Sequence, residues 1–384
     1  MSQSVVASAD AAYFERGCER VISSPELAAK LAEKRPLRVK LGFDPSSPDL
    51  HLGHAVVLDK VRQFQDAGHR AVIIIGDYTA RIGDPTGRSK TRMPLSPEQV
   101  EVNAKTYTEQ VFKILDERRT EIRRNSEWFD KFTYADVLKL NSRMTVARLL
   151  ERDDFRKRYS EGAPITLTEF QYPLMQGWDS VMIAADVELG GSDQLFNNLV
   201  GRELQRDMGQ APQCVMVLPI LEGTDGVEKM SKSLGNAIGI TTPPFEMFSK
   251  IMSISDELMA RWYPLLLKEN VDAAIHPMES KKALAQRVTA RFHSVEAAQH
   301  ARQEWEQQFS QRQAPEVMQD VAVANFPTWA HLLKECGLCG STSEARRLIA
   351  QGGVTLNGGR VLNPNEAPKP GVLKCGKRHY RRLV

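Results

Sequence analysis

The stretch LGFDPSSPDLHLGH, residues 41–54, decides the fold expected for this chain. An apolar run over residues 37–43 predicts a buried strand, and a turn rich in Pro and Ser follows it. The turn leads to His51, Gly53 and His54 at the start of a helical pattern. Free backbone N–H groups at a helix N-terminus attract phosphate, and a glycine there lets a large ligand approach the backbone. We therefore expect a nucleotide triphosphate to bind here.

The segments that follow extend this unit to a parallel sheet. Apolar positions at helical spacing continue to Gly68, and residues 71–75 form a β-branched run typical of a strand buried on both faces. Strand, helix and strand in this order form a βαβ unit, in which ligands collect beyond the carboxyl ends of the strands. Residues 181–187 and 214–218 are predicted to be further buried strands. The expected fold class is α/β, with a Rossmann-like parallel sheet.

Composition excludes several classes of protein. The chain has 384 residues, of which 42% are hydrophobic, so wholesale disorder is excluded. No apolar run approaches the length of a membrane span, and the N-terminus lacks the basic and apolar regions of a secretory signal. Five scattered cysteines do not suggest a disulfide framework. We expect a cytoplasmic protein with no membrane partner.

The charge of the chain is unevenly distributed. The net charge is +3, but residues 325–384 hold ten Lys or Arg and only three Asp or Glu. A basic tail on a mildly acidic body favours a polyanionic partner for the tail. The alternative is a tail whose charges serve only solubility.

The expected domain division follows these patterns. Residues 1–236 form the sheet domain, with a helical insertion near residues 126–171. Residues 237–312 are almost continuously helical in pattern, and residues 313–327 form a linker. Residues 328–384 form a small α/β unit.

Two further segments carry polar side chains suited to ligand binding. In YPLMQGWD, which begins at Tyr172, a helix is predicted to start near Pro173, and its spacing places Gln176 and Asp179 on one face. Residues 222–236 form a polar loop with few apolar residues.

These pieces resemble a known family. The segments HLGH, residues 51–54, and KMSKS, residues 229–233, resemble the two signature motifs of class I aminoacyl-tRNA synthetases. Tyr172, Gln176 and Asp179, together with GSDQ at residues 191–194, make the chain similar to the bacterial tyrosyl-tRNA synthetases along nearly its whole length. Residues 335–358 resemble the small RNA-binding module that ends those chains.

The resemblance implies a reaction in two steps. The carboxylate of L-tyrosine attacks the α-phosphorus of ATP, and the 3′-terminal ribose of tRNA(Tyr) then accepts the tyrosyl group. A carboxylate is ionised at neutral pH, so the first step needs positioning and charge neutralisation more than a general base. Magnesium is expected to accompany ATP, with ligands from the phosphates and no protein-bound metal. The family also implies a homodimer, formed through the insertion near residues 126–171.

The resemblance also assigns roles to individual residues. Catalytic contacts to the phosphates are expected from His51, His54, Lys229, Lys232, Arg88 and Arg92. Further ATP contacts are expected from Gly53, Met230, Ser231 and Asp193. Tyrosine contacts are expected from Gly42, Asp44, Asp84, Tyr172, Gln176, Asp179 and Gln194. Within these sets Asp179 accepts a hydrogen bond from the phenol, and Asp193 and Gln194 fit either the ribose or the tyrosine carboxylate. Contacts to the RNA backbone are expected from Arg346, Arg347, Lys377, Arg378, Arg381 and Arg382.

One position departs from the family pattern. Much of the family has a tyrosine two residues before Gly42, where it supplies a second contact to the phenol, and here Lys40 occupies that position. Either this chain belongs to a subgroup that recognises the phenol differently, or the pocket is rearranged. Specificity then depends more on Asp179.

Three alternatives remain open at this stage. A tryptophanyl-type enzyme shares the fold and both signatures, although the helix with Gln176 and Asp179 and the terminal RNA module argue against it. A synthetase-derived RNA-binding protein without catalysis is the second, against which the intact signatures count. In the tail, a zinc site could be drawn from Cys336, Cys339 and Cys375 with His379, although cysteines also pack well as small apolar side chains.

Overall fold

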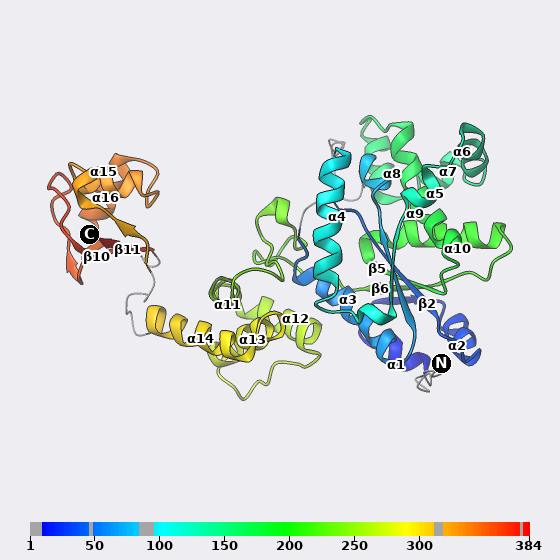
Figure 1. Ribbon diagram of the computed structural model, residues 1–384, viewed down its shortest axis with the longest axis horizontal. Helices are drawn as coiled ribbons and strands as arrows, with labels where there is room; N and C mark the ends of the chain where they lie inside the picture. Colours follow the sequence, from blue (N-terminus) through cyan, green and yellow to red (C-terminus); the bar gives the residue numbers. More distant parts are fainter. Residues whose placement is uncertain (1–9, 46–48, 84–95, 311–317, 377–378) are drawn as a thin grey trace. The chain divides into compact units, whose positions relative to one another are not determined.

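The computed structural model describes residues 10–45, 49–83, 96–310, 318–376 and 379–384. The expected site residues outside this part of the chain are Asp84, Arg88, Arg92, Lys377 and Arg378. The chain divides into two compact units, Met1–Ser294 and Val295–Val384 (Figure 1). The finer division expected from the sequence stays a prediction.

The first unit is built on a six-stranded sheet (Figure 1). In spatial order its strands are β1 (Arg20–Ile22), β6 (Cys214–Leu218), β5 (Val187–Gly191), β2 (Arg38–Phe43), β3 (Arg70–Ile75) and β4 (Thr120–Arg124). All neighbouring pairs are parallel except β1 with β6, so the Rossmann-like sheet is confirmed. The chain order of the strands reverses between β5 and β2, which is where ligands bind in such sheets.

Alternation along β2 separates the two faces of this sheet. Phe43 contacts His54 of α3 (Leu52–Asp66) and Tyr107 of α4 (Pro97–Val111), which cover one face. Lys40 points to the other face, where its amine contacts α9 (Leu167–Met182). Helix α10 (Leu195–Asp207) packs along α9 on that side.

Two predictions around α9 were wrong. The expected strand at residues 181–187 is the end of α9, and β5 begins only at Val187. A short apolar run does not by itself distinguish a strand from a buried helix end. The helix also starts before Pro173, because Thr166 and Glu169 form a reciprocal capping box about two turns earlier.

The remaining helices of the first unit form three groups. Two lie near the N-terminus, α1 (Ala11–Glu15) and α2 (Ser24–Ala32). Four lie between β4 and α9, namely α5 (Ser126–Phe129), α6 (Tyr134–Asn141), α7 (Val146–Leu149) and α8 (Asp153–Ser160). Three follow the sheet, namely α11 (Pro244–Met252), α12 (Asp256–Leu267) and α13 (Pro277–Phe292). None of the helices among the described residues is long and apolar enough to cross a membrane.

The second unit combines helices with a five-stranded sheet. Its helices are α14 (Val295–Trp305), α15 (Trp329–Glu335) and α16 (Thr342–Ala350). In spatial order its strands are β7 (Asp320–Val321), β11 (His379–Leu383), β10 (Gly371–Cys375), β8 (Val354–Leu356) and β9 (Gly359–Arg360). Cys375 belongs to its apolar core, and Cys336 and Cys339 pack against that core. The three cysteines therefore occupy positions suited to small apolar side chains.

Candidate active site

A cleft of about 1220 Å³ opens at the carboxyl ends of β2 and β5. Every described residue that the sequence assigned to ATP or tyrosine lies in its lining. These are Gly42, Asp44, His51, Gly53, His54, Tyr172, Gln176, Asp179, Asp193, Gln194, Lys229, Met230, Ser231 and Lys232.

Backbone hydrogen bonds join the two signature segments. The N–H of Leu52 donates to the carbonyl of Ile238 over 3.0 Å, and the N–H of Ile240 donates to the carbonyl of Leu50 over 3.0 Å. Because residues 238–240 follow the second signature after only four intervening residues, this pairing brings both signatures to one cleft. A Cβ on Gly53 would lie 3.0 Å from the His51 ring, so a larger residue here would press against that ring.

The two histidines stack at the N-terminus of α3. Their ring centroids lie 3.8 Å apart, and Nδ1 of His54 accepts from the backbone N–H of His51 over 3.1 Å. Burial and, to a smaller extent, the nearby charges of Lys229 and Lys232 lower the pKa of His51 to about 2 and that of His54 to about 4. Both imidazoles are therefore neutral at neutral pH, so they can act as hydrogen-bonding groups but not as cations.

The signature lysines supply the positive charge of the site. Lys229 pairs with Asp193, with 2.7 Å between Nζ and Oδ2, and Lys232 pairs with Asp49. Asp49 also accepts from Nε2 of Gln110 over 3.1 Å. Sequence reasoning did not single out Asp49, although it lies between Asp44 and His51.

A buried amide fixes the loop that carries the second signature. Oδ1 of Asn236 accepts from the backbone N–H of Ser231 over 2.8 Å, and its Nδ2 donates to Asp225 over 2.6 Å. Asn236 was not among the expected residues. It is the third residue after the signature, but only the folded loop shows which groups it joins.

Asp44 is held at the end of β2 by two hydroxyl groups. The Tyr172 hydroxyl donates to its Oδ2 over 2.8 Å, and Oγ1 of Thr79 donates to its Oδ1 over 2.9 Å. A Cβ on Gly76 would lie 2.1 Å from the Asp44 carboxylate, so this approach requires a glycine at the end of β3. Sequence reasoning did not find Thr79.

Two buried asparagines orient the amide of Gln176. Asn197 donates to Oε1 of Gln176 over 2.7 Å, and Nε2 of Gln176 donates to Oδ1 of Asn198 over 3.1 Å. Asn197 also donates to Gln194 over 3.3 Å, which connects two of the expected tyrosine contacts. A buried amide with partners on both of its atoms has a fixed orientation.

Asp179 is a buried carboxyl group in the lining of the cleft. Its Oδ1 accepts from Nε1 of Trp128 over 3.0 Å. Burial raises the pKa of Asp179 to about 8, and the charge of Lys40 and the Trp128 hydrogen bond oppose that rise. The site therefore presents neutral histidines and two lysines on one side, and a buried carboxyl group on the other.

Comparison with known proteins agrees with this geometry. Residues 32–310 match the family described as tRNA synthetases class I (W and Y), and residues 331–373 match the S4 domain. The chain belongs to the class I tRNA synthetases of this type. This synthetase is 51% identical to the tyrosine–tRNA ligase of Oleidesulfovibrio alaskensis, over 96% of this chain and 97% of the relative. It is 50% identical to the tyrosine–tRNA ligase of Bordetella pertussis, over 98% of this chain and 96% of the relative.

Solved structures share the fold of this synthetase. A C-terminally truncated mitochondrial tyrosyl-tRNA synthetase of Aspergillus nidulans matches with a TM-score of 0.61 and 23% identity, over 77% of this chain and 92% of that chain. The tyrosyl-tRNA synthetase of Archaeoglobus fulgidus complexed with L-tyrosine matches with a TM-score of 0.58 and 23% identity, over 76% and 98%.

The S4 match contains part of the expected RNA-binding set. Arg346 and Arg347 are exposed on α16, and Arg382 is exposed on β11. Arg382 lies 3.7 Å from Asp320, and Arg381 is half-buried and donates to the carbonyl of Tyr380 over 2.8 Å.

Proposed function

We propose that this synthetase activates L-tyrosine with ATP and transfers the tyrosyl group to tRNA(Tyr). The observation that carries the proposal is the backbone pairing of residues 50–52 with residues 238–240, by which both signatures lie at the cleft that Asp179 also lines. Relatives that are half identical over nearly the full chain are tyrosine–tRNA ligases, which supports tyrosine over tryptophan.

In the first step the tyrosine carboxylate forms a bond to the α-phosphorus, and the bond to the pyrophosphate oxygen breaks. His51 and His54 stabilise the reacting phosphate by hydrogen bonding, since both imidazoles are neutral. Lys229 and Lys232 neutralise the charge that moves onto pyrophosphate. Magnesium accompanies ATP through ligands from the phosphates.

Tyrosine is held at both ends of the cleft. The ammonium group contacts Asp44, Tyr172 and Gln176, whose side chains are fixed by hydrogen bonds before the substrate arrives. The phenol donates to Asp179. A phenylalanine would leave this buried acceptor without a partner, which is the physical basis of discrimination.

In the second step the 3′-terminal ribose hydroxyl of tRNA attacks the tyrosyl carbonyl, and AMP leaves. The S4 module holds the RNA backbone through its exposed arginines, among them Arg346 and Arg347. The location of this reaction in the cytoplasm stays a prediction.

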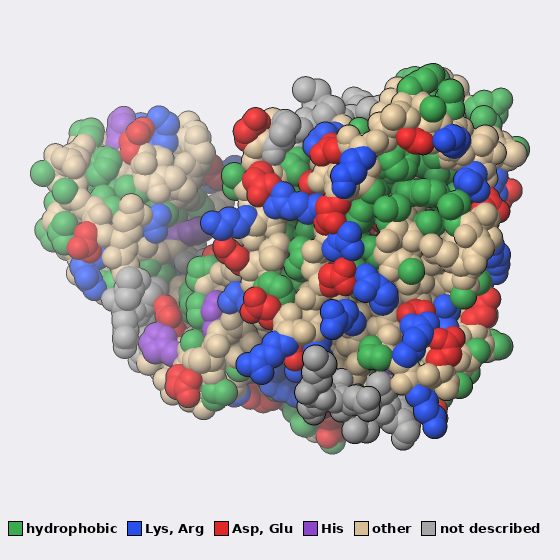
Figure 2. Space-filling model, turned by 45° about the vertical axis from the view of Figure 1, so that its right-hand side comes forward, with side chains coloured by type: hydrophobic (Ala, Val, Ile, Leu, Met, Phe, Trp, Pro, Cys, Tyr) green, Lys and Arg blue, Asp and Glu red, His purple; other side chains and the backbone are tan. Residues whose placement is uncertain are grey.

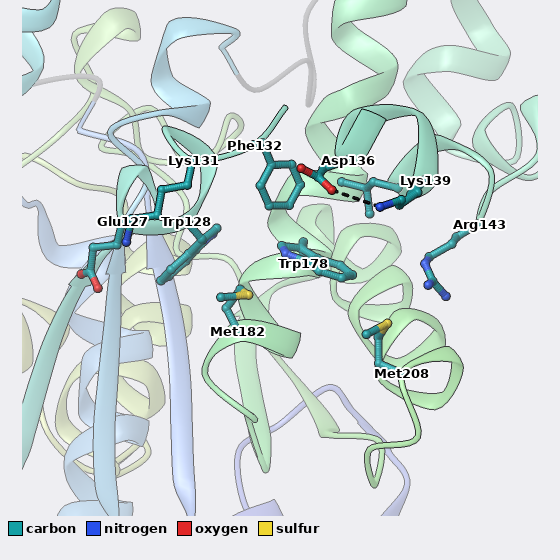
Figure 3. A pocket seen from close by; sticks show the side chains of 11 residues that line it. Glu127, Trp128, Lys131, Phe132, Asp136, Lys139, Arg143, Trp178, Met182 and Met208 are labelled. Atoms are coloured by element: carbon teal, nitrogen blue, oxygen red, sulfur yellow. Dashed lines mark hydrogen bonds and ion pairs between the residues drawn. The ribbon is translucent and has the colours of Figure 1, made fainter. Parts of the chain in front are cut away.

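The homodimer forms through the helices inserted before α9. A hollow of about 470 Å³ lies where this insertion meets α9 and the end of α10, and it is lined by Phe132, Trp178, Met182 and Met208 with charged residues around them (Figure 3). An apolar area is visible on the face that Figure 2 brings forward. Apolar patches with polar rims are typical of protein interfaces. Met182→Glu should shift the sedimentation of the protein to the monomer, whereas Ile275→Glu, at an exposed apolar residue outside the insertion, should not.

The function is tested by exchange of pyrophosphate into ATP. Exchange should depend on tyrosine and not on tryptophan, and transcribed tRNA(Tyr) should be charged. Exchange with tryptophan alone would support the tryptophanyl-type enzyme. RNA binding without exchange for either amino acid would support the inactive RNA-binding protein.

A further inference from the structure

The amine of Lys40 has three partners inside the protein. Its Nζ lies 2.8 Å from Oε1 of Glu188, 2.8 Å from the carbonyl of Gln176 and 2.7 Å from Oγ of Ser180. An ammonium group has three N–H donors, so these contacts use all of them. The side chain of Lys40 is 0% exposed, and Lys40 is not in the lining of the cleft.

These partners come from β5 and α9, which both contribute residues to the lining of the cleft. Lys40 and Glu188 are register partners on β2 and β5, the strands between which the strand order reverses. Gln176 and Ser180 lie one turn apart on α9. The ammonium group therefore links one turn of α9 to the centre of the sheet.

That turn carries side chains expected to bind tyrosine. Gln176 and Asp179 both project into the cleft, and the residues bound by the ammonium group bracket Asp179 in the sequence. A displacement of this turn moves both side chains together, because they belong to the same stretch of helix.

Glu188 extends the network through its second carboxylate oxygen. Its Oε2 accepts from Oγ of Ser180 over 3.2 Å and from Nε2 of Gln213. Gln213 also donates to the carbonyl of Asn198 over 3.1 Å, and the Asn198 side chain accepts from Gln176. The contacts thus lead from Gln176 through Lys40, Glu188, Gln213 and Asn198 back to Gln176. Gln176 is therefore held both at its backbone carbonyl and at its side-chain amide.

Removal of one charge from such a network has a larger effect than removal of both. A buried ion that loses its partner is strongly destabilising, whereas replacement of the whole pair by uncharged groups of similar volume is often tolerated. The pair can therefore be removed from a protein that still folds.

We propose that Lys40, paired with Glu188 in the lining of the cleft, is a positioning residue for tyrosine recognition, which sets Gln176 and Asp179 through α9 from behind the pocket. The inference rests on the proposed function. It gives Lys40 a role at the position where much of the family has a tyrosine: the lysine acts on the helix behind the pocket and not on the phenol.

The test is the double variant Lys40→Met/Glu188→Gln, assayed by pyrophosphate exchange. A small displacement of binding groups can cost on the order of a hundredfold, so we expect KM for tyrosine to rise roughly tenfold to a hundredfold. The preference for tyrosine over phenylalanine should decrease in the same variant. KM for ATP should stay within about twofold, because the signature residues do not contact this pair.

A second buried ion pair, between α2 and the residue before β5, provides the matched control. Lys30 lies 3.3 Å from Asp186, just before β5 begins and therefore at the opposite end of that strand from the cleft. Asp186 keeps Arg35 as a partner, so Lys30→Met does not leave an unpaired carboxylate. This variant should lower thermal stability without changing KM for tyrosine or the preference over phenylalanine.

Two outcomes would overturn the inference. One is a folded double variant with the KM for tyrosine and the preference of the wild type. The other is an equal change in the KM values for tyrosine and ATP, which would indicate a general structural role. Wild-type protein without tyrosine-dependent exchange would overturn the proposed function as well, so the two failures are distinguishable.

Discussion

On the phosphate side of the cleft, the signature lysines pair with carboxylates that remain partly in water, whereas on the tyrosine side Lys40 and Glu188 are almost completely buried. The side chain of Lys229 is 46% exposed and that of Asp193 is 26% exposed. The corresponding fractions for Lys40 and Glu188 are 0% and 2%. An exposed ion pair contributes little to stability, so its lysine can change partners at small cost.

The difference matches the two tasks of the cleft. The phosphate side must bind a highly charged group and then release pyrophosphate. Lysines that can exchange a carboxylate partner for a phosphate permit both steps. The tyrosine side must distinguish a hydroxyl group from a hydrogen, which requires polar groups that stay in place. Four changes test this comparison.

The largest effect is expected for Lys232→Ala. Loss of one group that stabilises the transition state typically lowers kcat by about 10²–10³. We expect that loss in pyrophosphate exchange, with KM for tyrosine changed less than about twofold. Lys250→Ala removes a lysine paired with Glu246 on α11 and serves as the control, which should leave kcat unchanged. Equal losses in the two variants would contradict a specific role for Lys232.

The next largest effect is expected for Asp179→Ala. The phenol loses its acceptor and Trp128 loses its partner, so tyrosine-dependent exchange should fall about tenfold to a hundredfold while KM for ATP stays constant. Asp179→Asn keeps an acceptor for Trp128 and should lose less. Unchanged exchange in the alanine variant would remove Asp179 from the tyrosine site.

A several-fold effect is expected from pH. The pKa of Asp179 is raised to about 8, so its carboxylate fraction, which accepts from the phenol, increases as the pH rises through this value. KM for tyrosine should therefore decrease several-fold from about pH 6.5 to about pH 8.5. His51 and His54 have pKa values of about 2 and about 4 and stay neutral over this range. The change should be absent in Asp179→Asn, and its persistence there would assign it to another group.

The smallest effect is expected for the stability of Asp49→Asn. The pair with Lys232 is partly exposed, so unfolding in urea should show a loss below about 1 kcal/mol. The single variant Lys40→Met leaves Glu188 buried and unpaired, and it should lose about 3–5 kcal/mol. Similar losses in the two variants would contradict the contrast between the two sides.

The elements that the sequence predicted well carry a strong local signal. Residues 71–75 and 214–218 are continuous apolar runs, and both are strands. The run at residues 181–187 is similarly apolar but lies at a helix end, where Ala184 adopts a positive φ of 47°. Strand β4 (Thr120–Arg124) was missed. It is a polar edge strand, and only its pairing with β3 identifies it as a strand.

The same contrast separates the site residues that were expected from those that were missed. His51, His54, Lys229 and Lys232 belong to contiguous motifs, which a single chain displays directly. Thr79, Asn197, Asn198 and Glu188 carry no motif. Their roles come from the partners that the fold brings to them, such as Asp44 for Thr79 and Gln176 for the asparagines.

The sequence by itself determined the βαβ core, the two signatures and the family, because hydrophobic periodicity and motif spacing are local properties of the chain. It also showed that Lys40 stands where much of the family has a tyrosine. Only the tertiary structure decided what that lysine does. Its three partners lie far away in the sequence, on β5 and α9, and a buried ammonium group is stable only where the fold supplies such partners.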